Sequence, residues 1–435
     1  MTRSASPASL TTPLVDLRIN CDRLLHRLDQ LAQIGAIAGG GVCRLALTDE
    51  DKAGRDLVVS WMRELGLTIT IDQLGNVVGT RPGLVAGAPV MTGSHIDTVA
   101  TGGRYDGNLG VLAGLEVIAT LNEHHIQTQN PLAVAFFTNE EGARFHPDMM
   151  GSWVFSGGLS SDAALAEVGT DGTTVAAELT RIGYAGTVPC GSQPVKAFVE
   201  LHVEQGPVLE QSGVQIGAVT GVQGMSWQEL MVTGVSNHAG TTPMSLRHDA
   251  GYGASAIAVA VRELALSMGG NQVATVGAIQ LKPGLVNVIA KEARMTVDLR
   301  NTDAALLRQA EAQLAEQIEA IAQKEGLNVT SRSLARFEPV TFDPVMVEQV
   351  VQTAQALGYS AKRMPSGAGH DAGMIAAIAP TAMIFVPSVN GLSHNVKEYT
   401  APTDLENGTN VLLQVLLQLA SSSKVEVIQP SLKHK

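Results

Sequence analysis

The chain has little cysteine and no long apolar run. Three cysteines occur in 435 residues, and no two of them have the CxxC spacing of a metal or redox motif. This small, odd number predicts reduced thiols, so we expect a cytoplasmic protein rather than one stapled by disulfides. No segment approaches the roughly 18 consecutive apolar residues of a membrane-spanning helix. Residues 1–13 lack the apolar core of a secretion signal, which indicates a loose start to the chain.

Basic residues are also few. Lysine and arginine total 29 against 41 aspartates and glutamates, which gives a formal net charge of −12. Such a charge repels phosphate backbones and anionic membrane surfaces, so we expect neither nucleic acid nor a membrane as a partner. It does not exclude a small anionic substrate, because one buried arginine can outweigh the average field. A length of 435 residues exceeds what one hydrophobic core supports, so two domains are expected.

Helical and strand patterns alternate through most of the chain. Some segments repeat apolar residues every three or four positions, and others are short continuous apolar runs bounded by turn residues. We expect strands at 68–71, 76–80, 89–94, 132–138 and 198–203, and helices at 14–35, 49–65, 106–121 and 403–419. This alternation predicts the α/β class, with a central mixed sheet flanked by helices.

The pattern changes near Gly221. The segments that follow are expected to be strand, helix, strand, strand, helix and strand, at 228–233, 247–266, 273–281, 293–300, 303–324 and 327–331. This βαββαβ order is that of the ferredoxin-like split motif. We therefore assign 1–220 and 336–435 to a discontinuous catalytic domain and 221–335 to an inserted domain.

His95 and Asp106 open a set of residues with metal-binding chemistry. His95 follows a buried strand, Asp97 lies two residues on, and Asp106 stands among glycines within 102–107. A carboxylate beside a histidine can hydrogen-bond its second ring nitrogen and fix its tautomer, which is the role we predict for Asp97. Asp106 taken alone fits a turn or a helix cap. A tight glycine-flanked loop also suits a carboxylate that bridges two cations.

Four more candidates have similar surroundings. Glu140 and Glu141 come directly after the apolar run 132–138. His202 lies near the end of another expected strand, and His394 lies in a loop of small residues. The ordinary alternative for Glu140 and Glu141 is a solvated pair of acids. For His202 it is an exposed edge strand, and for His394 it is an incidental loop histidine. Ligands of open α/β sheets, however, gather beyond the carboxyl ends of strands. Histidines with a shared carboxylate suit two adjacent divalent cations, and of two neighbouring acids one can ligate while the other acts as general base.

Further residues suggest substrate binding. His238 lies in an unusual loop between a strand and a helix, where a helix cap is the alternative role for its neighbours. Arg300 ends a strand with a polar face, which is either solvated or a bidentate clamp for a carboxylate. His370 follows a glycine turn that begins at Ser366, and we place both in the substrate pocket or behind it.

Five motifs, in this order, resemble the amidase, hydantoinase/carbamoylase family. That family includes N-carbamoyl-L-amino acid hydrolases, allantoate amidohydrolases and β-ureidopropionases, and it belongs to the clan of dinuclear zinc peptidases and aminoacylases. The motifs are GSHIDTV (93–99), GRYDG (103–107), TNEEGARF (138–145), LHVEQG (201–206) and NHAGTTPM (237–244). The resemblance runs in order from His95 to His394.

The resemblance implies two divalent metal ions. Zinc is the first expectation, and manganese, cobalt or nickel also accept this donor set. His95, Asp106 and His202 would bind one ion. Asp106, Glu141 and His394 would bind the other, with Asp106 bridging the two.

The resemblance also implies roles for residues around the metals. Glu140 would be the general base, and Asp97 would orient His95. His238 would stabilise the developing oxyanion, and Arg300 would grip the substrate carboxylate. The implied substrate contacts are Gln205, His238, Asn287 and Arg300.

The implied reaction is metal-dependent hydrolysis of the carbamoyl C–N bond of an N-carbamoyl-L-amino acid or a related ureido acid, giving the amino acid, ammonia and carbon dioxide. Allantoate and β-ureidopropionate remain alternative substrates. An aminoacylase or dipeptidase of the same clan is a further alternative, and so is an inactive relative that binds a ureido acid or a protein. The spacing of eleven residues from His95 to Asp106 favours the carbamoylase branch. We expect a homodimer joined through the inserted domain, which would also close over the substrate.

Overall fold

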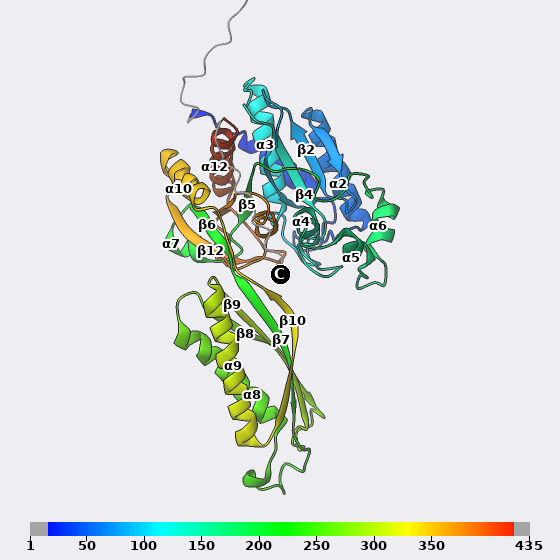
Figure 1. Cartoon of the computed structure of the whole chain (residues 1–435), viewed down its shortest axis with the longest axis vertical. Coiled ribbons are helices and arrows are strands. Elements are labelled where there is room, and N and C mark those ends of the chain that lie inside the picture. The colour runs from blue at the N-terminus through cyan, green and yellow to red at the C-terminus, as the bar shows by residue number, and fades with distance from the viewer. Residues whose placement is uncertain (1–15, 422–435) are drawn as a thin grey trace, which may run out of the picture. The chain divides into compact units, whose positions relative to one another are not determined.

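The computed structural model describes residues 16–421, so the expected loose start, residues 1–13, lies outside the described residues. The chain divides into two compact units. The second unit comprises Gly221–Thr341 and Pro365–Gly369, and the first comprises the rest of the described chain (Figure 1). No helix within residues 16–421 is both long and apolar enough to cross a membrane.

Most strands of a large mixed sheet belong to the first unit. Its strands run in the order β1-β2-β4-β3-β5-β13-β6-β11, and β12 also pairs with β6. The strands are β1 (Thr68–Ile71), β2 (Val77–Arg81), β3 (Val90–His95), β4 (Leu132–Phe137), β5 (Ala197–Val203), β6 (Ile216–Val222), β11 (Val340–Thr341), β12 (Ala361–Ser366) and β13 (Thr381–Val386). The neighbours β4, β3, β5 and β13 are parallel and completely buried, as continuous apolar runs require.

Helices cover this sheet. α3 (Asn108–Glu123) packs on β3, β4 and β5, and α12 (Pro402–Ser421) packs on α3, β5 and β13. The remaining helices of the unit are α1 (Cys21–Ala32), α2 (Asp49–Glu64), α4 (Met150–Phe155), α5 (Ser161–Ala166), α6 (Val175–Ile182), α7 (Val208–Ser212), α10 (Pro344–Ala356) and α11 (Asp371–Ile375). The predicted α/β class, with a central mixed sheet flanked by helices, is confirmed.

The second unit contains one antiparallel sheet and two helices. Its elements are β7 (Gly224–Thr233), α8 (Ala250–Met268), β8 (Val273–Lys282), β9 (Glu292–Asn301), α9 (Ala304–Glu325) and β10 (Asn328–Phe337). The strands pair in the order β10-β7-β9-β8, and α8 and α9 lie side by side against the sheet (Figure 1). The aspartates Asp249 and Asp303 cap the two helices, and a core of aliphatic side chains joins helices and sheet.

Several expectations about local structure differ from the structure. The helix expected from residue 14 begins at Cys21, where Asn20 caps it. The helix expected from Asp106 begins at Asn108, so Asp106 stays in the loop with its side chain free of the helix. The short segment Pro365–Gly369 joins the second unit, because Arg300 Nη1 donates to the Gly367 carbonyl and Gln223 N donates to the Ser366 carbonyl.

Candidate metal centre

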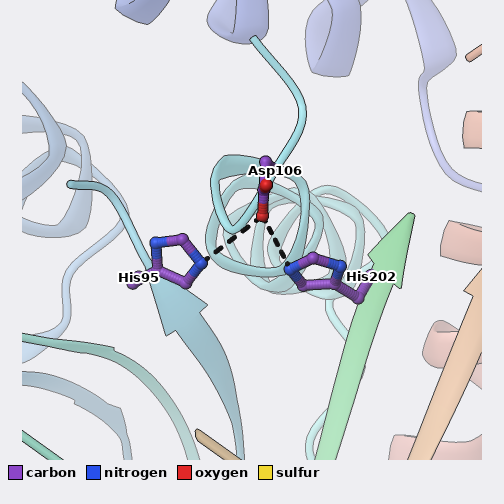
Figure 2. Close-up of side chains that lie close together, drawn as sticks. All are labelled: His95, Asp106 and His202. Carbon is purple, nitrogen blue, oxygen red and sulfur yellow. Dashed lines mark ion pairs between the residues drawn. The ribbon is translucent and has the colours of Figure 1, made fainter. Parts of the chain in front are cut away.

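Two buried histidines lie at the carboxyl ends of neighbouring strands. His95 is the last residue of β3, and His202 is the next-to-last residue of the adjacent parallel strand β5. Asp106, from the loop before α3, points between the two rings (Figure 2). One nitrogen from each ring and one Asp106 oxygen all lie within 4.8 Å of one another. This is the edge of an α/β sheet at which ligands are expected.

Main-chain carbonyls fix the orientation of both rings. His95 Nδ1 lies 2.9 Å from the Asp97 carbonyl oxygen, and His202 Nδ1 lies 2.8 Å from that of Val203. A carbonyl only accepts, so each Nδ1 carries a hydrogen and the neutral ring keeps its lone pair on Nε2. Those Nε2 atoms face Asp106 Oδ1 at 3.6 and 3.2 Å. His202 Nε2 also accepts from the Gly107 N–H at 3.1 Å. Where a ring nitrogen faces an anionic oxygen, a proton or a cation between the two atoms stabilises the pair, so this geometry suits a metal ion.

A second group shares Asp106. His394 Nε2 lies 3.3 Å from Asp106 Oδ2 and 3.3 Å from Glu141 Oε2. Asp106 therefore offers one oxygen to each group, which is the arrangement of a carboxylate that bridges two cations. The side chain of His394 is 50% exposed, whereas those of His95 and His202 are 1% exposed, so the two groups differ in solvent access.

Electrostatics at the centre favour added positive charge. Burial raises the pKa of Asp106, but the rings of His202, His394 and His95 outweigh burial and hold that pKa well below its usual value. The contacts with Asp106 and Glu141 raise the pKa of His394 to about 10. Carboxylates surround the rings closely enough to stabilise cationic imidazoles. A divalent cation supplies the same charge at the ring nitrogens, so the residues present fit a metal.

Asp97 does not hold His95 in the predicted way. Its carboxylate oxygen is 4.0 Å from His95 Nδ1, and its main-chain carbonyl takes the hydrogen bond instead. The carboxylate accepts from the backbone N–H groups of Glu140 and Glu141, at 3.3 Å each. The expected carboxylate–histidine bond is wrong because the Asp97 carboxylate is directed at the Glu140 and Glu141 N–H groups instead. Asp97 thus connects the His95 loop to the pair of acids after β4.

Glu140 lies beside His95, a member of the first group of candidate ligands. Its Oε2 is 3.4 Å from His95 Nε2, and the residue is 7% exposed. Burial raises the pKa of Glu140 well above its usual value, and the attraction of His95 only partly offsets this. A buried carboxyl with a raised pKa is the kind of group that takes and returns protons near neutral pH.

Gly107 makes the approach of Asp106 and His95 possible. Its φ is +65°, and a Cβ at this position would lie 2.4 Å from the His95 ring. Both the backbone conformation and the space therefore require glycine. The glycine-flanked loop that suggested a metal site in the sequence has this physical basis.

Gln205, predicted as a substrate contact, holds Asp106. Its Nε2 donates to Asp106 Oδ2 at 3.0 Å and to Ser393 Oγ at 3.2 Å. Both amide hydrogens are therefore used. Its Oε1 is buried and has no donor among residues 16–421, so it remains available to an N–H group of a ligand.

His370 lies behind the first group. Its ring centroid is 4.6 Å from that of His202, and burial lowers the pKa of His370 well below its usual value, which favours the neutral ring. His370, His202 and Glu200 also approach one another within 4.8 Å. Glu200, however, already accepts from the Ser94 hydroxyl and from the Ala372 N–H, at 2.6 and 2.8 Å. Its oxygens are satisfied, so we do not assign a third metal group.

Four predicted substrate contacts lie in the second unit: His238, Asn287, Arg300 and Ser366. His238 Nδ1 accepts from the N–H groups of Gly240 and Thr241, which leaves a hydrogen on the exposed ring's Nε2. The Ala239 N–H donates to the Asn287 carbonyl, so those two loops are neighbours. Ser366 donates its hydroxyl to the Ala368 carbonyl within its own turn.

Arg300 is held by its own unit. Its Nε donates to Asp298, two residues away on the same strand face, at 3.0 Å. Its Nη1 donates to Gly367, and its guanidinium carbon lies 5.9 Å from the centre of the Trp227 ring. The remaining guanidinium hydrogens are at the end of the side chain, where a carboxylate can be bound.

Several residues around the centre were not identified from the sequence. Arg44 is fully buried and donates to the carbonyls of Ile96, Leu31 and Ile34 and to the side chain of Asn108. Nothing in the local sequence near Arg44 indicates these partners. Ser393 and Glu398 also went unnoticed, although both flank His394 within five residues. Their nearness to a predicted ligand was the available signal.

Comparison with known proteins gives consistent matches. The model of the peptidase family M20/M25/M40 matches residues 91–418. An N-carbamoyl-L-amino-acid amidohydrolase of Rhizobium meliloti is 41% identical over 412 residues, covering 94% of this chain and 99% of that protein. An allantoate amidohydrolase of Bacillus subtilis is 36% identical over 399 residues, covering 90% and 96%. A solved amidase of the hydantoinase/carbamoylase family from Burkholderia multivorans has a TM-score of 0.91 at 48% identity, covering 93% of this chain and 99% of that one.

Proposed function

The chain belongs to the peptidase family M20/M25/M40 and, within it, to the hydantoinase/carbamoylase amidases, and we propose that it hydrolyses the carbamoyl C–N bond of an N-carbamoyl-L-amino acid. The products are the amino acid, ammonia and carbon dioxide. The observation that carries this proposal is the cluster of His95, Asp106, Glu141, His202 and His394 in a chain whose near-full-length relatives act on ureido compounds.

The enzyme is metal-dependent, and the donor set supports two divalent cations. His95, Asp106 and His202 would hold one ion, and Asp106, Glu141 and His394 the other. Zinc is the first candidate, and manganese, cobalt and nickel suit the same nitrogen and oxygen donors. Such a pair, when bound, lowers the pKa of a water and polarises the carbonyl of the substrate.

Glu140 would act as the general base. Its buried carboxylate takes a proton from the water as the water oxygen bonds to the carbamoyl carbon. The carbon–nitrogen bond then breaks, and Glu140 returns the proton to the leaving nitrogen of the amino acid. The carbamate that remains decomposes to ammonia and carbon dioxide. Asp97 supports these steps by holding the backbone N–H of Glu140.

Polar groups with unused hydrogen-bonding capacity are the proposed substrate contacts. The exposed Nε2–H of His238 suits the developing oxyanion, and the end of the Arg300 fork suits the substrate carboxylate. The unpartnered Oε1 of Gln205 suits a ureido N–H. Asn287, Ser366 and His370 complete the proposed set of contacts.

The second unit would serve as a lid and a dimerisation domain. Its βαββαβ order and its β10-β7-β9-β8 sheet support a ferredoxin-like domain. We propose a homodimer joined through this domain, with closure that excludes water during the reaction.

Allantoate or β-ureidopropionate hydrolysis is the second candidate. The similarity to the Bacillus subtilis allantoate amidohydrolase over 90% of this chain favours keeping it. All three substrates share a ureido group and a carboxylate, so the same residues would serve each of them. They differ in the part of the molecule that lies between the two groups.

The test measures release of both ammonia and free amino acid by the metal-loaded chain, because an N-acetyl amino acid yields acetate and the amino acid but no ammonia. The panel comprises N-carbamoyl-L- and D-amino acids, β-ureidopropionate, allantoate and the N-acetyl forms of the same amino acids. We expect ammonia from N-carbamoyl-L-amino acids. Release from allantoate or β-ureidopropionate alone would favour the second candidate. Hydrolysis of only the N-acetyl compounds would contradict the ureido assignment and indicate an aminoacylase.

A further inference from the structure

The two histidines on strands and the histidine on a loop are held in place by different means. The rings of His95 and His202 each have a main-chain carbonyl as a partner for Nδ1. No residue among 16–421 hydrogen-bonds Nδ1 of His394, which has a φ of +52° and is half exposed. The position of this ring is therefore set by the loop that carries it, and something must hold that loop.

Glu398 is the group that ties this loop to Asp106. It is 5% exposed, and its Oε1 accepts the backbone N–H groups of Tyr105 and Asp106, both at 3.2 Å. Its own backbone N–H closes a turn on the Asn395 carbonyl at 2.9 Å, directly after His394. One carboxylate oxygen thus joins segments 292 and 293 residues apart in the sequence.

Ser393 provides the second link. Its hydroxyl lies 3.2 Å from Glu398 Oε2 and 3.3 Å from Asp106 Oδ2, and it accepts from Gln205. Ser393 immediately precedes His394. The bridging carboxylate, the loop histidine and Glu398 are therefore connected through a single hydroxyl.

Gly103 shows how closely Glu398 is fitted. A Cβ on Gly103 would lie 2.1 Å from Glu398 Oε1, and the neighbouring carboxyl carbon would be 2.2 Å away. Any larger residue at position 103 would displace the Glu398 carboxylate. The glycine gives the Glu398 carboxylate the space from which it reaches the backbone of Asp106.

We propose that Glu398 is a positioning residue that assembles the second cation site, Asp106–Glu141–His394, by holding the His394 loop against the Asp106 loop. This inference rests on the proposed function, because it presumes two cations. Two of the three ligands of the first site need no such support, since the sheet and two main-chain carbonyls already hold His95 and His202. Loss of Glu398 should therefore weaken one ion and spare the other.

The experiment titrates the metal-free, full-length protein with Mn²⁺ and measures stoichiometry and both dissociation constants by calorimetry and by electron paramagnetic resonance of free Mn²⁺. We expect two ions in the wild type. In Glu398→Ala one ion should bind about 10- to 100-fold more weakly, the usual effect of losing a residue that supports a ligand. The other ion should keep its affinity. Glu398→Gln should restore most of the loss, because the amide oxygen can still accept both backbone N–H groups.

Three further variants keep the inference testable if Glu398→Ala folds poorly. Ser393→Ala should weaken the same ion, and Gly103→Ala should resemble Glu398→Ala although Glu398 is present. Asp249→Asn is the matched control: one carboxylate oxygen of Asp249 accepts two backbone N–H groups, from Gly251 and Tyr252, at the start of α8 in the second unit. It should leave both constants unchanged.

If the wild type binds two ions and Glu398→Ala binds both with unchanged affinity, the inference is overturned and the proposed function stays intact. Equal weakening of both ions would also overturn it, because a general loosening does not select one site. A wild type that binds a single Mn²⁺ would instead contradict the two-cation proposal, and this inference with it.

Discussion

The two halves of the metal centre are built differently, although they share Asp106. His95 and His202 stand on adjacent parallel strands, are buried, and have ring partners from the main chain. Glu141 and His394 stand on loops, and His394 is half exposed with a left-handed backbone. The sheet preorganises the first half, whereas hydrogen bonds between distant loops assemble the second. We therefore expect the first half to be more rigid and to bind its ion more tightly.

The largest effect should come from the residue common to both halves. Asp106→Asn keeps the size of the side chain but removes the charge to which all three rings are directed. We expect loss of both ions and a fall in turnover of at least about 10²–10³-fold, the scale of losing charge stabilisation at the reacting group. Metal analysis and ammonia release measure this, with thermal unfolding as a control for the fold. Retention of both ions would remove Asp106 as the bridge.

Glu140→Gln should separate chemistry from metal binding. The amide cannot take a proton, so turnover should fall about 10²–10⁴-fold. Both ions should stay bound, because Glu140 belongs to neither cation group. The measurement is kcat with metal content determined on the same sample. Near-normal turnover would show that another group is the base.

Exchanging the histidines one at a time tests the comparison directly. His202→Ala removes a buried ring from the strand-borne half, and His394→Ala removes the exposed ring from the loop-borne half. We expect His394→Ala to keep one tightly bound ion. His202→Ala should lower the affinity of the strand-borne ion, because the sheet offers no replacement donor. Mn²⁺ titration of both variants decides this. A single tight ion in His202→Ala and none in His394→Ala would reverse our assignment of the rigid half.

Graded removal of metal should distinguish the halves in the unaltered protein. Dialysis against increasing chelator should remove the ion beside exposed His394 first, since solvent reaches that side. We expect a plateau at one ion per chain before the second is lost. Atomic absorption of the dialysed protein gives the count. Simultaneous loss of both ions would mean that the halves are energetically coupled, and the rigid–loose distinction would then fail.

Arg300→Ala should have the smallest effect on catalysis and none on the metals. Arg300 belongs to the second unit, and its role would be to bind the substrate carboxylate. We expect KM to rise with little change in kcat. The loss of binding free energy should be about 1–3 kcal/mol, the value of one charged contact. A ureido compound without a carboxylate serves as the control substrate. An equal effect on that compound would make Arg300 structural.

The chemical identities at the centre followed from motifs along the chain. Two histidines near strand ends, an aspartate among glycines and adjacent glutamates after an apolar run indicated a metal site, and the structure brings these residues together. The strand–helix alternation predicted the sheet because apolar periodicity reflects burial on one or both faces. Each of these signals lies within a few residues of sequence.

The partners of those residues followed only from the fold. Asp97 presents its carbonyl, not its carboxylate, to His95, because its carboxylate accepts from the N–H groups of Glu140 and Glu141, 43 and 44 residues away. Arg44 reaches Ile96 and Asn108, 52 and 64 residues away, from a position with no local motif. Segment 365–369 joins the second unit through a hydrogen bond from Arg300.

The sequence by itself therefore determined the fold class, the candidate ligands and the family to which they point, because those properties depend on residue type and short spacing. The tertiary structure decided how the ligands are held. His95 and His202 are fixed by backbone atoms, whereas His394 depends on Ser393 and on Glu398, whose carboxylate binds a loop almost 300 residues distant in the chain. Hydrogen bonds of this kind join residues that are distant in the sequence, so local sequence patterns do not predict them.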